Sequence, residues 1–246
     1  MLVNERIEFI VDWIKGYSDK VKYNPVSLII GVSGGVDSAV ASTLSAKTKL
    51  KTIAVSMPIR QNNEQHYLSL QHLEWLKSKF NNVETKIIEL DHVFNSFEKE
   101  MREYENKLAF ANSRSRLRMI TLYQIAQSSN GIVVGTGNKV EDFGVGFYTK
   151  YGDGGVDISP IADCTKSQVW EMGKDLGVLE EIVKAQPTDG LWDDGRTDVN
   201  QLGMSYQELE DAIKDPSNKG HKKYLEIRKR NLHKMSPIPV CKMKDD

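Results

Sequence analysis

The strongest chemical pattern in the chain is the hexapeptide Ser33-Gly34-Gly35-Val36-Asp37-Ser38. Two adjacent glycines let the backbone turn sharply and approach a ligand closely. Backbone N–H groups and the positive end of a following helix then face an anion, and the serine hydroxyls add donors. Because a carboxylate at Asp37 would repel a bare phosphate, we expect it to hold a divalent cation. The hexapeptide therefore predicts a phosphate site with a cation beside it.

The spacing of this hexapeptide excludes two common nucleotide-binding patterns. It matches neither GxxxxGK[ST] nor GxGxxG, so a Walker loop and a dinucleotide-binding turn are both ruled out. The alternative is a plain strand-to-helix turn in which Asp37 or Ser38 caps the helix. The whole hexapeptide follows directly after an apolar strand, which favours the phosphate site.

Alternating strands and helices must position this loop. Runs of β-branched and other apolar residues predict strands at 26–32, 52–57, 84–90 and 131–135. Helical periodicity predicts helices at 5–17, 38–47, 63–80, 93–107 and 113–128. This alternation indicates an α/β fold in which a doubly wound parallel sheet is covered on both faces, giving three layers. Ligands bind beyond the carboxyl ends of such strands, which draws attention to the residues after 32, 57 and 134.

Two polar, glycine-rich stretches, at 136–158 and 186–203, are long for simple connections. Long loops in compact domains often act as lids or binding loops, and we expect that role here.

Composition narrows the class of protein. The 246 residues are 39% hydrophobic, which suits one α/β domain over residues 1–246. The formal net charge of -1 gives no basic field for nucleic acid, and no apolar run is long enough to cross a membrane. The N-terminus does not resemble a signal peptide, and Cys164 and Cys241 have no metal-binding spacing. We therefore expect a cytoplasmic protein with two reduced thiols.

The hexapeptide resembles the PP-loop of the ATP pyrophosphatase superfamily, also called the adenine nucleotide alpha hydrolase-like fold, a Rossmann-like architecture. Members cleave ATP between the α and β phosphates and transfer AMP to an acceptor. The resemblance implies that these residues contact ATP: Gly31, Val32, Ser33, Gly34, Gly35, Val36, Asp37 and Ser38. The loop alone does not distinguish asparagine, argininosuccinate and GMP synthetases or tRNA-modifying enzymes.

Three later segments resemble NAD synthetases in particular. The first is Asn112-Ser113-Arg114-Ser115-Arg116-Leu117-Arg118-Met119, which is similar to the family helix N-x-x-A-R-x-R-M. The resemblance implies that Arg116 contacts deamido-NAD, and a planar guanidinium suits carboxylate or phosphate oxygens. Arg116 and Arg118 could instead lie on a solvated helix face, which is what we expect for Arg114.

The second segment is Gly135-Thr136-Gly137-Asn138-Lys139-Val140-Glu141, directly after the fourth predicted strand. It resembles the family segment G-T-x-x-x-x-E, which implies that Thr136 contacts ATP and that Glu141 binds Mg²⁺. Asp37 and Glu141 would then be two hard oxygen ligands from adjacent strand ends, as Mg²⁺ prefers. A loop glutamate with no such partner would simply be solvated.

The third segment is Gly146-Phe147-Tyr148-Thr149-Lys150-Tyr151-Gly152-Asp153-Gly154-Gly155-Val156-Asp157. It resembles the family signature G-[FY]-x-T-K-[FY]-G-D-G-x-x-D, which implies that Lys150 and Asp157 bind deamido-NAD and that Asp153 lies near the incoming ammonia. A plain glycine-rich hairpin would explain the glycines but not these three charged residues. By the same resemblance, other residues map onto ATP contacts (Lys166 and Thr188) or onto dinucleotide contacts (His233 and Lys234).

The resemblance as a whole implies an ammonia-dependent NAD synthetase, a carbon–nitrogen ligase. Such an enzyme uses ATP and Mg²⁺ to amidate deamido-NAD through an acyl-adenylate, giving NAD, AMP and pyrophosphate. Asp37 and Asp153 are the expected catalytic residues. The resemblance also implies a homodimer, and we expect no glutaminase domain, no nucleic-acid partner and no membrane partner.

Two departures from the family pattern keep other functions open. Val199 replaces a family glutamate, and Asp189-Gly190 replaces Ala-Asp. A tRNA-modifying PP-loop ligase would need a basic surface or metal-binding cysteines, which the sequence lacks. A nucleotide sensor without catalytic activity would be expected to have lost Asp37, Glu141 or Asp153, yet all three are present.

Overall fold

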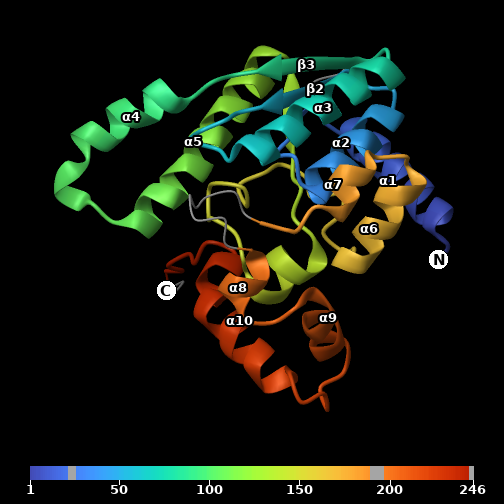
Figure 1. Ribbon diagram of the computed structural model, residues 1–246. Helices are drawn as coiled ribbons and strands as arrows, with labels where there is room; N and C mark the ends of the chain where they lie inside the picture. The colour runs from blue at the N-terminus through green and yellow to red at the C-terminus, as the bar shows by residue number, and fades with distance from the viewer. Residues whose placement is uncertain (22–25, 189–196, 244–246) are drawn as a thin grey trace.

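The computed structural model describes residues 1–21, 26–188 and 197–243 (Figure 1). A four-stranded parallel sheet has the order β3-β2-β1-β4. The strands are β1 (Ser27–Gly31), β2 (Thr52–Ser56), β3 (Val83–Ile87) and β4 (Gly131–Val134). In β1, Leu28 pairs with Thr52 of β2 and with Ile132 of β4. The predicted strands and the parallel sheet are confirmed.

Helices connect the strands and follow them. They are α1 (Val3–Ser18), α2 (Val36–Lys47), α3 (Asn63–Lys79), α4 (Asp91–Glu100), α5 (Lys107–Ser128), α6 (Lys166–Asp175), α7 (Glu180–Lys184), α8 (Asp198–Leu202), α9 (Tyr206–Lys214) and α10 (His221–Met235). Two short turns of other helix types are η1 (Arg102–Tyr104) and the π-helix η2 (Lys139–Val145). The helices predicted up to residue 128 are all present, with shifted ends.

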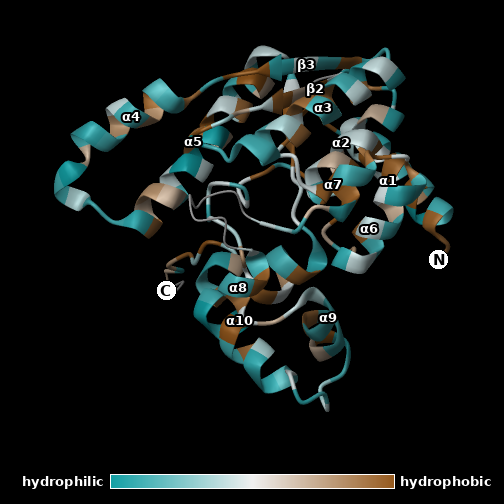
Figure 2. Ribbon diagram, in the orientation of Figure 1, coloured by the Kyte–Doolittle hydropathy of each residue, from teal (hydrophilic) through white to brown (hydrophobic). Residues whose placement is uncertain are grey.

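Each face of the sheet has its own hydrophobic core. Leu28 and Ile30 of β1 pack on the face covered by α1, α2, α3, α6 and α7, whereas Ile29 packs on the face covered by α4 and α5. This alternation follows from the two-residue repeat of a strand. Hydrophobic residues lie toward the sheet, and the helices that cover the sheet are mostly hydrophilic on their outward-facing sides (Figure 2). The predicted three-layer fold is therefore confirmed.

The small side chains of α2 let this helix lie close against the sheet. Ala39, Ala41, Ser42, Thr43 and Ser45 are all buried. The hydroxyls of Ser42 and Thr43 donate to the carbonyl of Ala39, and Ser45 donates to Ala41, so their polar groups are satisfied within the helix. A close, well-packed α2 fixes the position of the loop at its N-terminus.

The chain changes direction in the sheet between β1 and β4. From β1 it proceeds to β2 and β3 on one side, and it returns to the other side of β1 only with β4. A reversal of this kind opens a crevice at the carboxyl ends of the two strands, where open α/β sheets bind ligands. The Ser33–Ser38 hexapeptide follows β1, and the Gly135–Glu141 segment follows β4.

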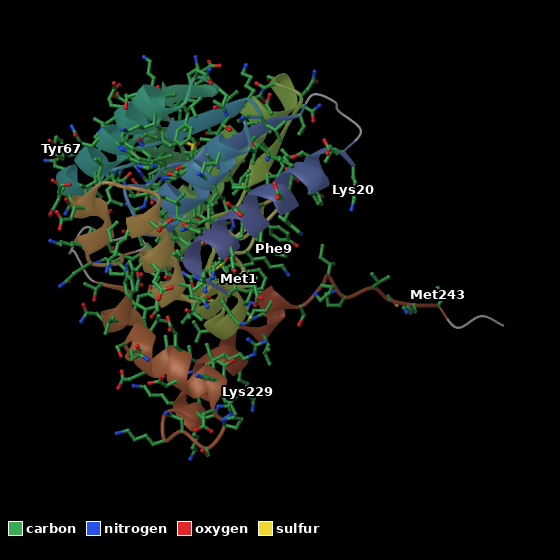
Figure 3. All side chains as sticks on the ribbon, turned by 90° about the vertical axis from the view of Figure 1, so that its right-hand side faces the viewer. Met1, Phe9, Lys20, Tyr67, Lys229 and Met243 are labelled. Atoms are coloured by element: carbon green, nitrogen blue, oxygen red, sulfur yellow. The ribbon has the colours of Figure 1, made fainter. Side chains whose placement is uncertain are left out.

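The C-terminal helices form a second, smaller hydrophobic cluster against η2. Buried residues of α8, α9 and α10 meet Val140 and Val145 of η2, and these helices lie below the sheet in Figure 1. Beyond α10, residues 236–243 run away from the rest of the molecule (Figure 3). The stretch at 136–158, predicted as a loop, therefore contains a packed helical turn. The prediction was wrong there because Val140 and Val145 are buried by helices distant in the sequence.

The structure also bears on the predicted lack of a membrane-spanning segment and on the two cysteines. None of the described helices is both long and apolar enough to span a bilayer. Cys164 is buried and Cys241 is exposed, and both are free thiols. The middle of the second predicted loop, at 189–196, lies outside the described residues, and so does the Asp189-Gly190 departure from the family pattern.

Candidate active site

The loop after β1 is held by its own serine side chains. The Ser38 hydroxyl donates to the Gly35 carbonyl at 2.9 Å, and the Ser33 N–H donates to the Ser38 hydroxyl at 3.2 Å. The hydroxyls of Ser33 and Ser38 lie 3.1 Å apart. Gly35 is the N-cap of α2, so the N–H groups of the first helical turn point toward the carboxyl end of β1. This geometry agrees with the predicted anion-binding loop.

Gly34 is required by the geometry of this loop. Its φ is +93°, and a Cβ at this position would lie 2.4 Å from the carbonyl oxygen of Gln65. Both the backbone conformation and the close approach of α3 exclude a larger residue. The first glycine of the pair therefore serves the turn, as expected.

A buried cation–carboxylate cluster joins the two strand ends. Lys166 Nζ donates to Asp37 Oδ2 at 2.5 Å and to Glu141 Oε1 at 2.8 Å. The Lys166 side chain is 2% exposed, and those of Asp37 and Glu141 are 16% and 15% exposed. The structure thus brings together the residues at positions 37, 141 and 166, which were predicted separately from three sequence segments.

Opposite charges offset the burial of Lys166 and Glu141 in this cluster. Burial disfavours the charge on Lys166, but the two carboxylates raise the pKa of Lys166 above its usual value. Burial also favours a neutral Glu141, yet Lys166 and the Tyr206 hydroxyl hold the pKa of Glu141 below its usual value. For Asp37, burial outweighs the attraction of Lys166 and raises the pKa. Lys166 is therefore a charged ammonium at neutral pH.

Three further residues belong to this cluster, and the sequence did not predict a role for them in it. Asn138 donates to Asp37 Oδ1 at 3.1 Å, and its own carbonyl oxygen accepts the N–H groups of Val140 and Glu141. The Tyr206 hydroxyl contacts Glu141 Oε1 and lies 2.7 Å from Asp198 Oδ2. The sequence did not reveal these roles, because the three residues contact other side chains of the protein and do not belong to a known ligand-binding motif.

The residues present fit a magnesium ion that is shared with a nucleotide. Among the described residues, no cluster of three or more His, Cys, Asp or Glu side chains could hold a metal ion unaided. Mg²⁺ is usually held by one or two carboxylates together with substrate phosphates and water, and not by a complete protein cage. Asp37 and Glu141 supply two such carboxylates, and they already enclose a positive charge in the form of Lys166.

Two more carboxylates lie beside the cluster. Although Asp153 is accessible to solvent, its Oδ1 accepts the Ser115 hydroxyl at 2.6 Å and the Thr149 N–H at 3.1 Å. Partial enclosure by the protein raises the pKa of Asp153 despite these donors. Burial raises the pKa of Asp142 well above its usual value, and the charges of Asp153, Glu141 and Asp37 add to this effect. Ammonium is a cation, so this negative region suits its approach.

Basic residues gather where α10 meets the segment after η2. Lys150 Nζ lies 3.4 Å from the carbonyl oxygen of His233, and Arg116 Nε donates to the Lys150 carbonyl at 3.2 Å. Lys234 Nζ donates to the Tyr148 carbonyl at 2.8 Å and lies 5.1 Å from the centre of the Tyr148 ring. The fold thus brings together four of the predicted substrate-binding residues, at 116, 150, 233 and 234.

The remaining predicted residues are less directly connected. Asp157 accepts the Val133 N–H at 2.7 Å and the Tyr123 hydroxyl at 3.0 Å, so its carboxylate ties its own segment to β4 and α5. Thr136 lies two residues beyond the end of β4 and is half-buried. Thr188 is also half-buried and is the last described residue before position 197.

One expectation about the arginine helix is wrong. Arg114 is 7% exposed and not solvated, and its guanidinium lies 5.8 Å from the centre of the Phe94 ring. An aromatic ring from α4 covers this face of α5, which the local pattern around residue 114 did not reveal. Arg116 is exposed, as its proposed ligand role requires, and Arg118 donates to the Met57 carbonyl at 2.9 Å.

Comparisons with known proteins show the family of this chain. The family model for NAD synthase matches residues 6–244. A curated relative from Mesoplasma florum, named NH(3)-dependent NAD(+) synthetase, is 35% identical over 240 residues, which cover 96% of this chain and 93% of the relative. The relative from Carboxydothermus hydrogenoformans has the same name and is 36% identical over 84% of this chain and 83% of its own length.

Solved structures show the same fold. The NMN synthetase from Francisella tularensis superimposes with a TM-score of 0.88 and 34% sequence identity, over 99% of this chain and 100% of that chain. The NH3-dependent NAD synthetase from Campylobacter jejuni gives a TM-score of 0.78 at 24% identity, over 98% of this chain and 100% of its own. With a family model that spans almost the whole chain and relatives above one third identity, the chain belongs to the NAD synthase family.

Proposed function

We propose that this protein is an ammonia-dependent NAD synthetase that amidates deamido-NAD with ATP. This proposal rests on one observation. Lys166 contacts both Asp37 and Glu141, beside the glycine-rich loop that follows β1. A carbon–nitrogen ligase needs a phosphate-binding loop, a cation site and a place for the amine, and each has a candidate here. The names of the curated relatives support the same reaction.

In the first step, the nicotinate carboxylate of deamido-NAD attacks the α-phosphorus of ATP, and pyrophosphate leaves. The N–H groups at the start of α2 and the ammonium of Lys166 stabilise the charge that builds on the leaving oxygens. Thr136 and Thr188 would contact the nucleotide from the strand end and from the loop beyond α7. Arg116, Lys150, His233 and Lys234 would hold the dinucleotide in line for attack.

The cation is part of this proposal. Mg²⁺ would be held by Asp37 and Glu141 together with ATP oxygens, and it would supply positive charge against the phosphates when bound. Lys166 then serves as the counter-charge of the same two carboxylates before the cation enters.

In the second step, ammonia attacks the acyl carbon, the acyl–oxygen bond breaks, and AMP leaves with that oxygen. Ammonium is the main species near neutral pH and must first lose a proton. Asp153 lies in the negative region beside Asp142 and can attract ammonium and accept that proton. Asp157 would support this segment through its bonds to Tyr123 and to β4.

A second candidate substrate is nicotinate mononucleotide. The solved structure with the TM-score of 0.88 is named an NMN synthetase, and the same activation and amidation applied to the mononucleotide would give NMN. The chemistry at Asp37, Glu141 and Asp153 would not change, because both substrates present the same nicotinate carboxylate. Only the contacts to the rest of the substrate would differ.

One experiment decides between these two substrates. The ratio kcat/KM would be measured with deamido-NAD and with nicotinate mononucleotide, at saturating ATP, Mg²⁺ and ammonium, and NAD, NMN and AMP would be quantified. We expect a higher kcat/KM for deamido-NAD. A clear preference for the mononucleotide would assign the NMN synthetase reaction, and no AMP with either substrate would refute the ligase proposal.

We also propose that the protein forms a homodimer and uses free ammonia. Ile120 and Tyr123 of α5 are 66% and 38% exposed, one and two turns beyond Arg116 on the same helix face. A contiguous apolar patch can mark an interface, and these two residues would be part of such a patch. Light scattering on wild-type protein and on Ile120→Asp would test it, with a dimer expected for the first and a monomer for the second.

A further inference from the structure

We propose that Tyr206, fixed by Asp198, is a positioning residue that orients Glu141 for the divalent cation. This inference rests on the proposed function, since it assumes that Glu141 binds a cation together with ATP. It assigns a role to two residues that the proposed reaction does not otherwise use, one at the start of α9 and one at the start of α8.

The contacts define how Glu141 is held. The Tyr206 hydroxyl and Lys166 Nζ both reach Oε1 of Glu141, the latter at 2.8 Å. Asn138, which also donates to Asp37, is a further side-chain partner of the Glu141 carboxylate. The two donors on Oε1 restrict the rotation of the carboxylate group. A ligand held in this way pays less entropy when a cation binds.

Tyr206 itself has little freedom. It is 5% exposed, and its ring packs edge-on against Trp170 with the ring centres 5.9 Å apart. The Lys166 ammonium lies 4.7 Å from the centre of the same ring. Ser205 caps α9 directly before it through a reciprocal pair of bonds with Glu208, so the backbone is fixed as well. The direction of the hydroxyl is therefore set by packing on all of these sides.

Asp198 is the second carboxyl group in contact with the hydroxyl, which has a single proton to donate. Its Oδ2 lies 2.7 Å from the Tyr206 oxygen, and the residue is 4% exposed. Asp198 is the first residue of α8, which is capped by Thr197 and Asn200. The neighbouring Val199, where the family has a glutamate, is 39% exposed. The carboxylate that reaches the site from this helix is thus Asp198, and the valine at 199 leaves the contact intact.

Residues that form hydrogen bonds to a metal-binding side chain commonly control how tightly that side chain binds the metal. Replacing such a partner typically weakens metal affinity by about 10-fold to 100-fold. A purely structural role for Tyr206, anchoring α9 to the sheet, would instead change protein stability without changing the part of ATP affinity that depends on the cation. The two roles can therefore be separated.

The test compares ATP binding with and without the cation. Dissociation constants for ATP would be measured by calorimetry in Mg²⁺ and in EDTA, without acyl substrate so that no AMP is transferred. For Tyr206→Phe we expect about a 10-fold weaker affinity in Mg²⁺ and an unchanged affinity in EDTA. Tyr224→Phe is the matched control, because Tyr224 is a buried tyrosine of the same hydrophobic cluster, and it should leave both constants unchanged.

Asp198→Ala provides the second variant. It should weaken affinity in Mg²⁺ by a smaller factor, and it should have no further effect when combined with Tyr206→Phe, because both act through the same hydroxyl. Equal affinities of wild type and Tyr206→Phe in Mg²⁺, or an equal loss in EDTA, would overturn the inference. If Tyr206→Phe does not fold, an unchanged Mg²⁺-dependent affinity in Asp198→Ala would overturn it alone.

The result of this ATP-binding test does not depend on whether the protein amidates deamido-NAD. A protein that fails to amidate deamido-NAD but shows this pattern would refute the proposed function and retain the inference. A protein that makes NAD with cation-dependent ATP binding unaffected by Tyr206→Phe would do the reverse.

Discussion

At the scale of single residues, the site combines charges that would be unfavourable alone. Lys166 is almost fully buried, and a buried ammonium is tolerated only when carboxylates accompany it. Asp37 and Glu141 provide that charge, and they come from two different strand ends. The removal of either carboxylate therefore affects both the cation site and the lysine.

Asp37→Asn should lower kcat by about 10²-fold to 10³-fold, the usual cost of losing one aligned electrostatic group. The expected cause is loss of a cation ligand and of the partner of Lys166. AMP formation with deamido-NAD, ATP and ammonium measures the effect. Asp163→Asn is the control, since its partner Lys139 forms an exposed ion pair in which Asp163 is 95% exposed. Similar losses in both variants would contradict a specific role for Asp37.

Asp153→Asn should separate the two chemical steps. The first step does not use Asp153, so a burst of pyrophosphate should still form in the first turnover. Formation of NAD should slow by about 10²-fold, the range for loss of a general base. Rapid-quench measurement of pyrophosphate and NAD in the same samples tests this. Loss of the pyrophosphate burst itself would show that Asp153 acts before ammonia enters.

Much of the candidate site was predictable because its residues occur in motifs next to strand ends. Asp37, Glu141 and Lys166 were each selected from sequence, and the structure joins them. Tyr206 and Asp198 were not predictable in this way, since Tyr206 contacts Glu141, and Asp198 contacts Tyr206, only after α8 and α9 pack against η2. Arg114 was misjudged for the same reason, because Phe94 covers it from another helix.

At the scale of elements, the two loops after β1 and β4 carry most of the chemistry. Both lie at the carboxyl ends of adjacent parallel strands, so the sheet order itself places them together. Their rigidity depends on glycine conformation and on serine and asparagine bonds within the loops. Local backbone geometry is therefore as important for the site as its charged groups.

Gly34→Ala should destabilise the protein by at least about 2 kcal/mol and weaken ATP binding. The added Cβ would combine a φ of +93° with a 2.4 Å contact to the Gln65 carbonyl. Urea unfolding measures the stability change. Gly16→Ala is the matched control, because a Cβ there meets nothing within 4 Å in the helix α1. It should stabilise the fold by about 0.5–1 kcal/mol. A harmless Gly34→Ala would mean that the loop adapts freely.

The predictable elements were those with a strong local pattern. β1 was predicted at 26–32 and spans Ser27–Gly31, and the sheet followed from strand–helix alternation. η2 was hidden in a stretch that contains several glycines, since its stability depends on burial of Val140 and Val145 by the C-terminal helices. α8 and α9 were missed because each is short and begins inside or beside a polar, glycine-rich segment.

At the scale of the whole molecule, one buried histidine links stability to pH. His72 is 0% exposed, lies 3.0 Å from the Ser42 hydroxyl and stacks on Trp75. Burial lowers the pKa of His72 from 6.5 to about 4. Below pH 6.5 the unfolded chain takes up a proton that the folded protein excludes, so stability is lost as pH falls from about 6.5 to about 4.

The size of this effect is about 3 kcal/mol at pH 4 for a shift of this magnitude. The free energy of unfolding in urea at several pH values between 4 and 7 measures it. His72→Phe should reduce the slope in this range, because phenylalanine has no proton to gain and can keep the stacking on Trp75. An equal slope in the variant would assign the acid sensitivity to other groups.

The fate of one oxygen atom tests the proposed reaction most directly. Deamido-NAD labelled with oxygen-18 in its nicotinate carboxylate would be converted with ATP, Mg²⁺ and ammonium, and AMP, pyrophosphate and NAD would be analysed by mass spectrometry. Attack of the carboxylate on the α-phosphorus followed by amidation predicts one labelled oxygen in AMP for each NAD, and none in pyrophosphate. Label in pyrophosphate or phosphate, or AMP without label, would contradict an acyl-adenylate formed at Asp37, Glu141 and Lys166.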